Sequence, residues 1–257
     1  MIEAPQGYVI REECRKAAWQ NGYRRQQGEE DGWAKFGSTT AHGHIFLAAD
    51  SGNGIWLLAL DHAGVTAELG LPAANVPGPG LARFVFPKLA ALYAVLPRVY
   101  TLALSLPDGP LQSFIEATRS LPRATEAERL VVQRIGQDIF RERLIAYWNG
   151  RCPLTGIREM ELLRASHIKP WAKASSDAER LDVHNGLLLS ALWDAAFDRG
   201  LVSFADDGSP LFSPTLGAEA RAALCWAETL VLTAQHRAQL DWHRQHVFIH
   251  SRPATEG

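Results

Sequence analysis

The chain has 257 residues, with 26 Lys and Arg against 28 Asp and Glu and a hydrophobic fraction of 47%, so its formal charge is −2. This composition excludes disordered and collagen-like chains and leaves room for one large domain or two of ordinary size. Three widely spaced cysteines, Cys14, Cys152 and Cys225, indicate neither a disulfide framework nor a four-cysteine zinc site. We find no leader-like N-terminus and no apolar run of membrane-spanning length, and therefore expect a cytoplasmic protein with no membrane partner.

The first half of the chain predicts a mixture of helices and strands. Helical spacing of apolar residues over 8–20, followed by Asn21-Gly22, predicts an N-terminal helix. Two apolar runs, HIFLAAD and IWLLALD, flank a glycine-rich turn signal and so predict a β-hairpin. Downstream we expect a short helix capped by Asp61, a loop rich in proline and glycine, helices over 84–95 and 111–120, and a strand VYTLALSL between them.

A boundary near Leu121-Pro122 is expected to divide the chain into domains over 1–122 and 123–257. The segment TEAERLVVQRIGQDIFRERLIAYWNG follows this boundary and predicts one long helix with Thr125 as its N-cap. Residues 123–180 carry eleven Lys or Arg and eight Asp or Glu. This basic excess is modest but local, and it favours the C-terminal half as the part that meets nucleic acid.

One stretch of the C-terminal half carries residue types suited to catalysis. The run ELLRASHI predicts a short strand ending in His167, Asn185-Gly186 opens a new element, and LLLSALWDAAFD predicts a helix. Asp194 and Asp198 are four residues apart, so on a helix their carboxylates share one face. A strand-borne histidine opposite such a helix favours a one-metal hydrolytic site, in which imidazole activates water and a cation acts on the scissile phosphate.

This stretch resembles the HNH nuclease family, whose ββα-metal motif has a base histidine, an asparagine and a metal-binding residue on the closing helix. The runs RIGQDIFRERLIAYWNGRCPLTG, ASHIKPW, NGLLLS, FDRGLVSF and LDWHRQHVF extend the resemblance over 130–250, to the branch found in bacterial restriction-type endonucleases. The resemblance implies a C-terminal ββα-metal domain. Together with the helices and strands expected in the first half, it predicts an α+β protein in which an N-terminal α+β domain of unknown fold precedes that domain. It also implies metal-dependent cleavage of double-stranded DNA that leaves a 3′-hydroxyl and a 5′-phosphate.

Residue by residue, the resemblance assigns His167 as the general base and Asn185 as the asparagine that holds the base-bearing loop. The spacing Asn185-x8-Asp194-x3-Asp198 is that of family members with two metal-binding histidines, and Ser166 occupies the place of a frequent third ligand. Two carboxylates, a hydroxyl and several waters suit Mg²⁺ first and Mn²⁺ as the alternative, and they suit Zn²⁺ poorly.

Several of these residues have a simpler alternative role. Asp198 fits the Arg199-Gly200 turn as well as a metal. Asp194 lies among apolar neighbours, where an unpaired carboxylate is costly, so a partner or a metal is expected there. His184 is either a surface residue or a reserve ligand, and Cys152 is more typical of a buried apolar residue than of a ligand.

Two groups of residues are expected to contact nucleic acid. One polar face of the long helix is either solvated or in contact with phosphates, and it comprises Arg134, Gln137 and Arg141. The second group directly follows the base and comprises Lys169, Trp171 and Lys173. Trp171 has core packing as its alternative role.

The resulting hypothesis is a restriction-type endonuclease of host defence, with modified DNA as one candidate target. The N-terminal aromatics indicate either core packing or target selection, and they comprise Trp19, Tyr23, Trp33, Phe36 and Trp56, next to Arg24 and Arg25. Two rival functions stay open: a degenerate HNH-fold protein that binds DNA without cutting it, and a toxin-like nuclease controlled by a partner protein. A homodimer is an open alternative to a monomer.

Overall fold

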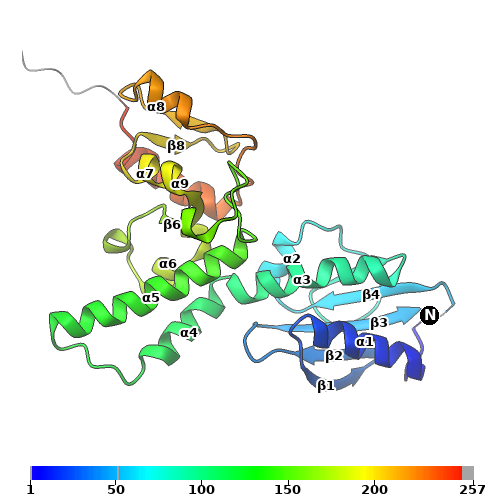
Figure 1. Ribbon diagram of the computed structural model, residues 1–257. Helices are drawn as coiled ribbons and strands as arrows, with labels where there is room; N and C mark the ends of the chain where they lie inside the picture. Colours follow the sequence, from blue (N-terminus) through cyan, green and yellow to red (C-terminus); the bar gives the residue numbers. More distant parts are fainter. Residues whose placement is uncertain (1, 51, 251–257) are drawn as a thin grey trace, which may run out of the picture. The chain divides into compact units, whose positions relative to one another are not determined.

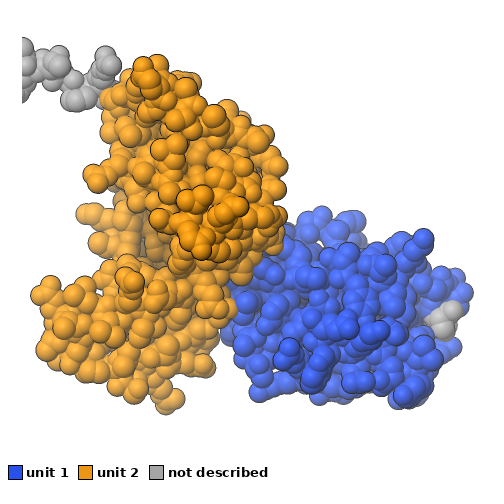
Figure 2. Space-filling view, viewed as in Figure 1, with its two compact units in different colours: residues 1–109 blue, residues 110–257 orange. Residues whose placement is uncertain are grey.

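A computed structural model describes residues 2–50 and 52–250 of the chain (Figure 1). The chain divides into two compact units, residues 1–109 and 110–257 (Figure 2). Both units contain helices and strands, so the predicted α+β class is confirmed. Among the described residues no single helix is long and apolar enough to cross a membrane, although one bent pair, Leu89–Ser105 with Asp108–Thr118, passes by length and composition alone.

Unit 1 is built on an antiparallel sheet in the strand order β1-β2-β3-β4-β5. The strands are β1 (Arg25–Glu30), β2 (Trp33–Gly37), β3 (His44–Asp50), β4 (Ile55–Leu60) and β5 (Ala82–Phe86). The helices are α1 (Tyr8–Gln20), α2 (Ala63–Glu68) and α3 (Leu89–Ser105). Helix α1 packs on β3 and helix α3 packs on β4. The predicted N-terminal helix and the predicted hairpin of β3 and β4 are both confirmed.

Apolar side chains occupy both faces of this sheet. Successive side chains of a strand point to opposite faces, so a continuous apolar run supplies apolar residues to both. On one face Leu47 of β3 pairs with Leu58 of β4, and both are fully buried. On the other face a buried cluster comprises Trp33, Phe46, Ala48, Leu57 and Ala59. Apart from Trp33 of β2, the residues named in both layers belong to the apolar runs that predicted the hairpin.

The expected helix over 84–95 is wrong at its start, where β5 ends at Phe86, and confirmed from Leu89 onward, whereas the expected strand VYTLALSL is wrong. In β5 the side chains of Phe84 and Phe86 share one face and pair with Leu58 and Trp56 of β4. Residues 89–105 form the single helix α3, whose residues buried at helical spacing include Leu92, Leu96, Val99, Leu102 and Ala103. Packing of this helix face outweighs the strand preference of the local sequence.

Two further features of unit 1 differ from the sequence expectation. Strand β1 is exposed along its whole length, so it lacks the alternating pattern from which a strand is predicted. Asp61 is not the cap of α2, because its carboxylate accepts the His44 backbone N–H at 2.6 Å and contacts His44 Nδ1 at 2.7 Å. The His62 ring caps the helix instead, accepting the Val65 N–H at 3.3 Å.

Unit 2 contains the second half of the chain. Its α-helices are α5 (Glu126–Tyr147), α6 (Asp177–Leu181), α7 (Ala191–Asp198), α8 (Ala218–Ala223) and α9 (Ala234–His246), and α4 (Asp108–Thr118) begins at the division between the units. Its strands are β6 (Leu163–His167), β7 (Gly186–Ser190), β8 (Val202–Phe204) and β9 (Pro210–Phe212). Short 3₁₀ helices are η1 (Met160–Leu162), η2 (Trp171–Lys173) and η3 (Val183–Asn185). The strands form two separate hairpins, β6-β7 and β8-β9.

The long helix α5 packs against several other elements of unit 2. Its N-terminus has a capping box, in which Thr125 accepts the Glu128 N–H and Glu128 accepts the Thr125 N–H, so the predicted cap is confirmed. Phe114 of α4 is buried and lies against Gly136 of α5, where a Cβ would approach its ring to 3.2 Å. Because α4 packs on α5, unit 2 begins ahead of the boundary expected near Leu121-Pro122.

Candidate functional site

A hairpin and a helix position the candidate catalytic residues. Strands β6 and β7 pair antiparallel, with Leu163 opposite Ser190 and His167 opposite Gly186. Helix α7 follows β7 directly. The predicted helix LLLSALWDAAFD is therefore wrong in its first third, which is strand: Leu187, Leu188 and Leu189 are fully buried, as in a strand covered on both faces.

Between the hairpin and α7 lies a cleft of about 470 Å³. Ser166 and His167 of β6 line it together with Asp194 and Asp198 of α7. The other lining residues are Ala165, Ile168, Pro170, Trp171, Arg199, His243 and Val247. The structure thus brings together the expected base and all three expected metal ligands.

The surroundings of His167 define its protonation state. Its ring stacks on Phe140 with centroids 3.8 Å apart, and Trp171 meets it edge-on at 5.7 Å. Its Nε2 lies 2.9 Å from the carbonyl oxygen of Arg180. Because a carbonyl only accepts, Nε2 carries the proton and Nδ1 is the basic nitrogen. Burial lowers the pKa of His167, which favours the neutral imidazole at neutral pH.

Asn185 is fully buried and ties together the loop that carries the base. Its Oδ1 accepts the Lys169 N–H at 2.8 Å, and its Nδ2 donates to the carbonyl oxygens of Lys169 and Glu179, both at 3.2 Å. Its backbone carbonyl accepts the Ile168 N–H at 3.0 Å. Side chain and backbone together hold the residues that follow His167.

The carboxylates of α7 lie on the cleft side of the helix. The Ser166 hydroxyl donates a short hydrogen bond to Asp194 Oδ1, which joins strand β6 to α7. Partial burial and the charge of Asp194 raise the pKa of Asp198 to about 6, whereas the charge of Arg199 acts in the opposite direction. Two carboxylates that repel each other beside a hydroxyl fit a hard divalent cation that completes its shell with water.

The candidate metal ligands of the cleft do not form a closed site, in which protein side chains alone would surround the ion. Among the described residues no group of three or more His, Cys, Asp or Glu side chains is placed to hold a metal ion. His184, the reserve ligand, is buried behind the cleft, where its Nδ1 contacts Asp182 Oδ1 at 2.8 Å and its ring meets Tyr147 and His236. The three expected ligands, Ser166, Asp194 and Asp198, all offer oxygen atoms, which suits Mg²⁺ or Mn²⁺ better than Zn²⁺.

The three residues after the base differ in their surroundings. Lys169 forms an ion pair with Glu179 at 2.8 Å, and its side chain is only 18% exposed. Trp171 lines the cleft and lies under the Arg180 guanidinium at 5.7 Å. Lys173 is exposed at the end of η2. Of the three, Trp171 reaches the cleft and Lys173 faces solvent.

The three residues of the polar face of α5 also differ in their surroundings. Arg134 is exposed and lies 4.0 Å from Asp138, and Gln137 is half-buried. Arg141 donates to the carbonyl oxygens of Leu163 and Met160 at 3.2 and 3.3 Å, so it holds the start of β6. Neither Arg134 nor Gln137 nor Arg141 lines the cleft.

Two residues of the cleft were not expected from the sequence. His243 of α9 is buried and stacks on Phe197 at 3.9 Å, and its Nδ1 lies 3.0 Å from the Ser203 hydroxyl. Burial lowers the pKa of His243 to about 4, so it stays neutral. Arg199 follows Asp198 directly, and a cation next to a candidate metal ligand in the sequence could have drawn attention to it.

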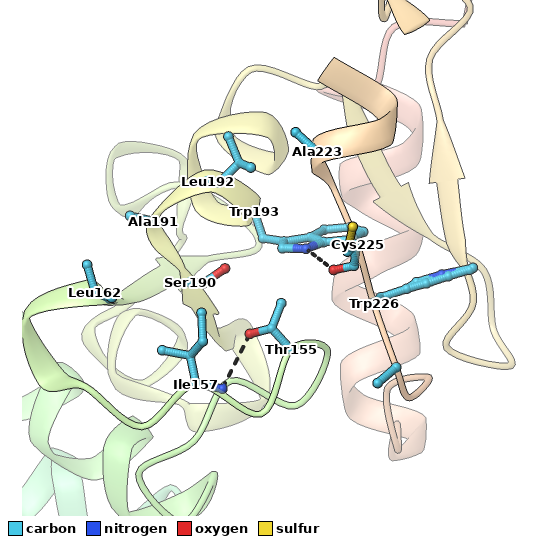
Figure 3. Close-up of a pocket in the computed structure, with 11 residues that line it drawn as sticks. Thr155, Ile157, Leu162, Ser190, Ala191, Leu192, Trp193, Ala223, Cys225 and Trp226 are labelled. Carbon is cyan, nitrogen blue, oxygen red and sulfur yellow. Dashed lines mark hydrogen bonds between the residues drawn. The ribbon is translucent and has the colours of Figure 1, made fainter. Parts of the chain in front are cut away.

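A larger hollow of about 620 Å³ lies at the other end of α7 (Figure 3). Ser190, Leu192 and Trp193 line it from the hairpin and α7, and Cys225 and Trp226 line it from the segment after α8. The Trp193 indole N–H donates to the Cys225 carbonyl oxygen at 3.1 Å. No charged side chain lines this hollow, so the smaller cleft is the better candidate for phosphate chemistry.

A β-hairpin that carries a half-buried histidine and is followed by a helix with two carboxylates has the order of elements expected of a ββα-metal motif. Residues 152–205 match the sequence model of the HNH endonuclease family. The C-terminal unit therefore carries an HNH domain, and the recognised resemblance to the HNH endonuclease family is confirmed. This domain supports hydrolysis of phosphodiester bonds, generally metal-dependent in this family, with DNA as the substrate. A comparison with curated proteins found no match.

Proposed function

We propose that the protein is a DNA endonuclease whose reaction takes place in the cleft of unit 2 and depends on Mg²⁺ or Mn²⁺. The observation that carries this proposal is the convergence of a neutral histidine, His167, with the oxygen ligands Ser166, Asp194 and Asp198 in one cleft of the HNH domain. General-base and metal-ion catalysis need these two kinds of group side by side.

In the proposed reaction His167 Nδ1 takes a proton from water. The water oxygen forms a bond to phosphorus as the bond from phosphorus to O3′ breaks, which leaves a 5′-phosphate and a 3′-hydroxyl that takes its proton from solvent. The Arg180 carbonyl fixes the tautomer, and Asn185 fixes the loop. A divalent cation held by Asp194, Asp198 and Ser166 would supply stabilisation of the charge that develops on the phosphate.

The direct test is nicking of supercoiled plasmid by the purified full chain with Mg²⁺, with Mn²⁺ and with EDTA. Cleavage with either metal and none with EDTA is expected. DNA binding without cleavage in all three conditions would instead support a degenerate HNH-fold binding protein. A toxin-like nuclease would differ in a second readout, because expression without a protective partner would stop host growth.

We further propose a restriction-type role, with modified DNA as one candidate target. Its support is the resemblance to restriction-type endonucleases together with a separate unit 1. Unmodified and modified phage genomes, digested side by side, would show selective cutting if this role is right. Equal digestion of all genomes would contradict it and leave the nuclease function intact.

A restriction role on duplex DNA requires cuts in both strands. A homodimer would place one cleft on each strand, and we propose this assembly for the DNA-bound state. Light scattering of the full chain with and without a duplex measures it directly. A monomer in both samples would contradict it.

A further inference from the structure

The side chain of Arg199 stands out among the cations of the cleft. It lies at the C-terminal end of α7, and it lines the same cleft as Ser166, His167 and Asp194. The residue is exposed, and its guanidinium makes no hydrogen bond or ion pair with any described residue. Its donors are therefore available to a ligand.

The backbone at Arg199 is held firmly. Gly200 has a φ of 67°, and a Cβ there would clash with the Val247 carbonyl, so the turn requires glycine. The Gly200 N–H donates to the Phe197 carbonyl and the Gly200 carbonyl accepts the Ile249 N–H, both at 2.9 Å. The Arg199 side chain thus extends from a fixed point at the edge of the cleft.

Other cations around the cleft are already committed to protein partners. Lys169 pairs with Glu179 at 2.8 Å, and Arg180 pairs with Asp177 at 2.8 Å. Arg244 pairs with Asp206 at 2.9 Å, and Arg141 donates to two carbonyl oxygens of the segment that leads into β6. Arg199 differs from all of these because it reaches the cleft and has no such partner.

The negative charges of the carboxylates and of a bound phosphodiester also favour a cationic side chain in the cleft. The carboxylates of Asp194 and Asp198, which line the same cleft, would balance one divalent ion. A phosphodiester adds a negative charge, and the transition state of its hydrolysis adds another. Arginine matches the geometry of phosphate oxygens with paired donors and stays charged at every working pH.

We propose that Arg199 binds the non-bridging oxygens of the scissile phosphate and stabilises the charge that develops there, a role that rests on the nuclease function proposed above. Lysine at this position would keep the charge but lose the paired donors. Alanine would lose both. The two variants therefore separate charge from geometry.

The experiment compares wild type, Arg199→Lys and Arg199→Ala in the full chain. For Arg199→Ala we expect single-turnover cleavage lower by on the order of 10²-fold, as for loss of one transition-state donor. We also expect DNA binding in EDTA to show a salt dependence less steep by about 0.9 in log–log slope, the value of one phosphate contact. Arg199→Lys should retain the wild-type slope and part of the cleavage. The exposed Arg221, which lies over Phe212 rather than in the cleft, provides the control Arg221→Ala with the same charge change.

A Mn²⁺ titration separates this role from a structural one. Removal of a cation beside Asp198 leaves Mn²⁺ affinity unchanged or raises it, whereas collapse of the site lowers it. Unchanged cleavage and slope in Arg199→Ala, or lower Mn²⁺ affinity in both variants, would overturn the proposal. If Arg199→Ala does not fold, the cleavage rate of Arg199→Lys tests the proposal. A rate below that of wild type supports it, and a rate equal to that of wild type contradicts it. If wild type does not cut, the nuclease function fails, and the salt slope still decides whether Arg199 contacts phosphate.

Discussion

The two units differ in what they bury. In unit 1 the buried polar residues among those described are few and comprise Gln6, Asp50 and Ser105. In unit 2 they are more numerous and comprise Thr118, Ser166, His184, Asn185, Ser190, Ser203, Ser213, His236 and His243. Burial of a polar group costs free energy unless it is hydrogen-bonded, so a concentration of such groups marks where a fold serves chemistry. Unit 1 buries mainly apolar surface, while unit 2 accepts this cost at more positions, of which Ser166 and His243 line the cleft.

The largest expected effect concerns His167, which lines the cleft of unit 2. His167→Ala should lower cleavage by about 10²–10⁴-fold, the usual contribution of a general base, while DNA binding stays near that of wild type. His246→Ala changes an exposed histidine of the same unit and should cut normally. Single-turnover rates on a labelled duplex measure both. Equal rates for wild type and His167→Ala would remove His167 from the mechanism.

The next effect concerns the two carboxylates. Asp194→Asn should lower cleavage by on the order of 10²-fold, and Asp198→Asn should lower it less, because Asp198 is exposed and adjoins a turn. Asp194 also accepts the Ser166 hydroxyl, so its loss disturbs both candidate ligands. Calorimetric titration with Mn²⁺ measures the affinities. Wild-type affinity in both variants would place the ligands elsewhere.

Asn185 tests whether a buried polar group in unit 2 holds the loop. Asn185→Ala removes three side-chain hydrogen bonds, so we expect a loss of about 2–3 kcal/mol in the free energy of unfolding. Asn185→Asp keeps the acceptor for the Lys169 N–H but turns a buried carboxylate toward two carbonyl oxygens, so it should destabilise the protein at least as much as alanine. Denaturant unfolding measures the series. An alanine variant as stable as wild type would show that the loop is held by other contacts.

The sequence predicts the cleft better than it predicts unit 1. His167, Asn185 and the α7 aspartates follow from short spacings in a recognisable motif, although residues distant in the sequence, such as Phe140 beside His167, help to position them. Helix α3 was missed because its apolar face is defined by packing against the sheet, which no local pattern contains. Arg199 stands next to a candidate ligand in the sequence, but its lack of a partner among the described residues is visible only in the fold.

A smaller effect is expected for the ion pair next to the base. Burial raises the pKa of Glu179, but hydrogen bonds from Lys169 and Ser175 outweigh it and lower the pKa to about 2. Because the folded pKa lies below the ordinary value of 4.5, the stabilisation is complete above pH 4.5 and is lost as pH falls toward about 2. Glu179→Gln should therefore cost about 1–2 kcal/mol at neutral pH and progressively less in acid. Parallel unfolding curves at several pH values check this, and a constant difference down to pH 2 would contradict it.

The smallest expected effect tests the role of unit 1. Tyr23, Trp33 and Phe36 are buried in its core, but Trp19 is 54% exposed and the Arg24 guanidinium lies over its ring at 5.6 Å. An exposed indole beside a cation offers a stacking surface for a base, and such a contact is worth about 1 kcal/mol or more. If unit 1 selects the target, Trp19→Ala should reduce the preference between modified and unmodified duplexes by roughly fivefold, which is about 1 kcal/mol, and leave the cleavage rate at saturating DNA unchanged. Anisotropy titrations of the full chain on both duplexes measure the preference. An unchanged preference would assign target choice to another surface, and a lower cleavage rate at saturation would mean that Trp19 acts through the fold.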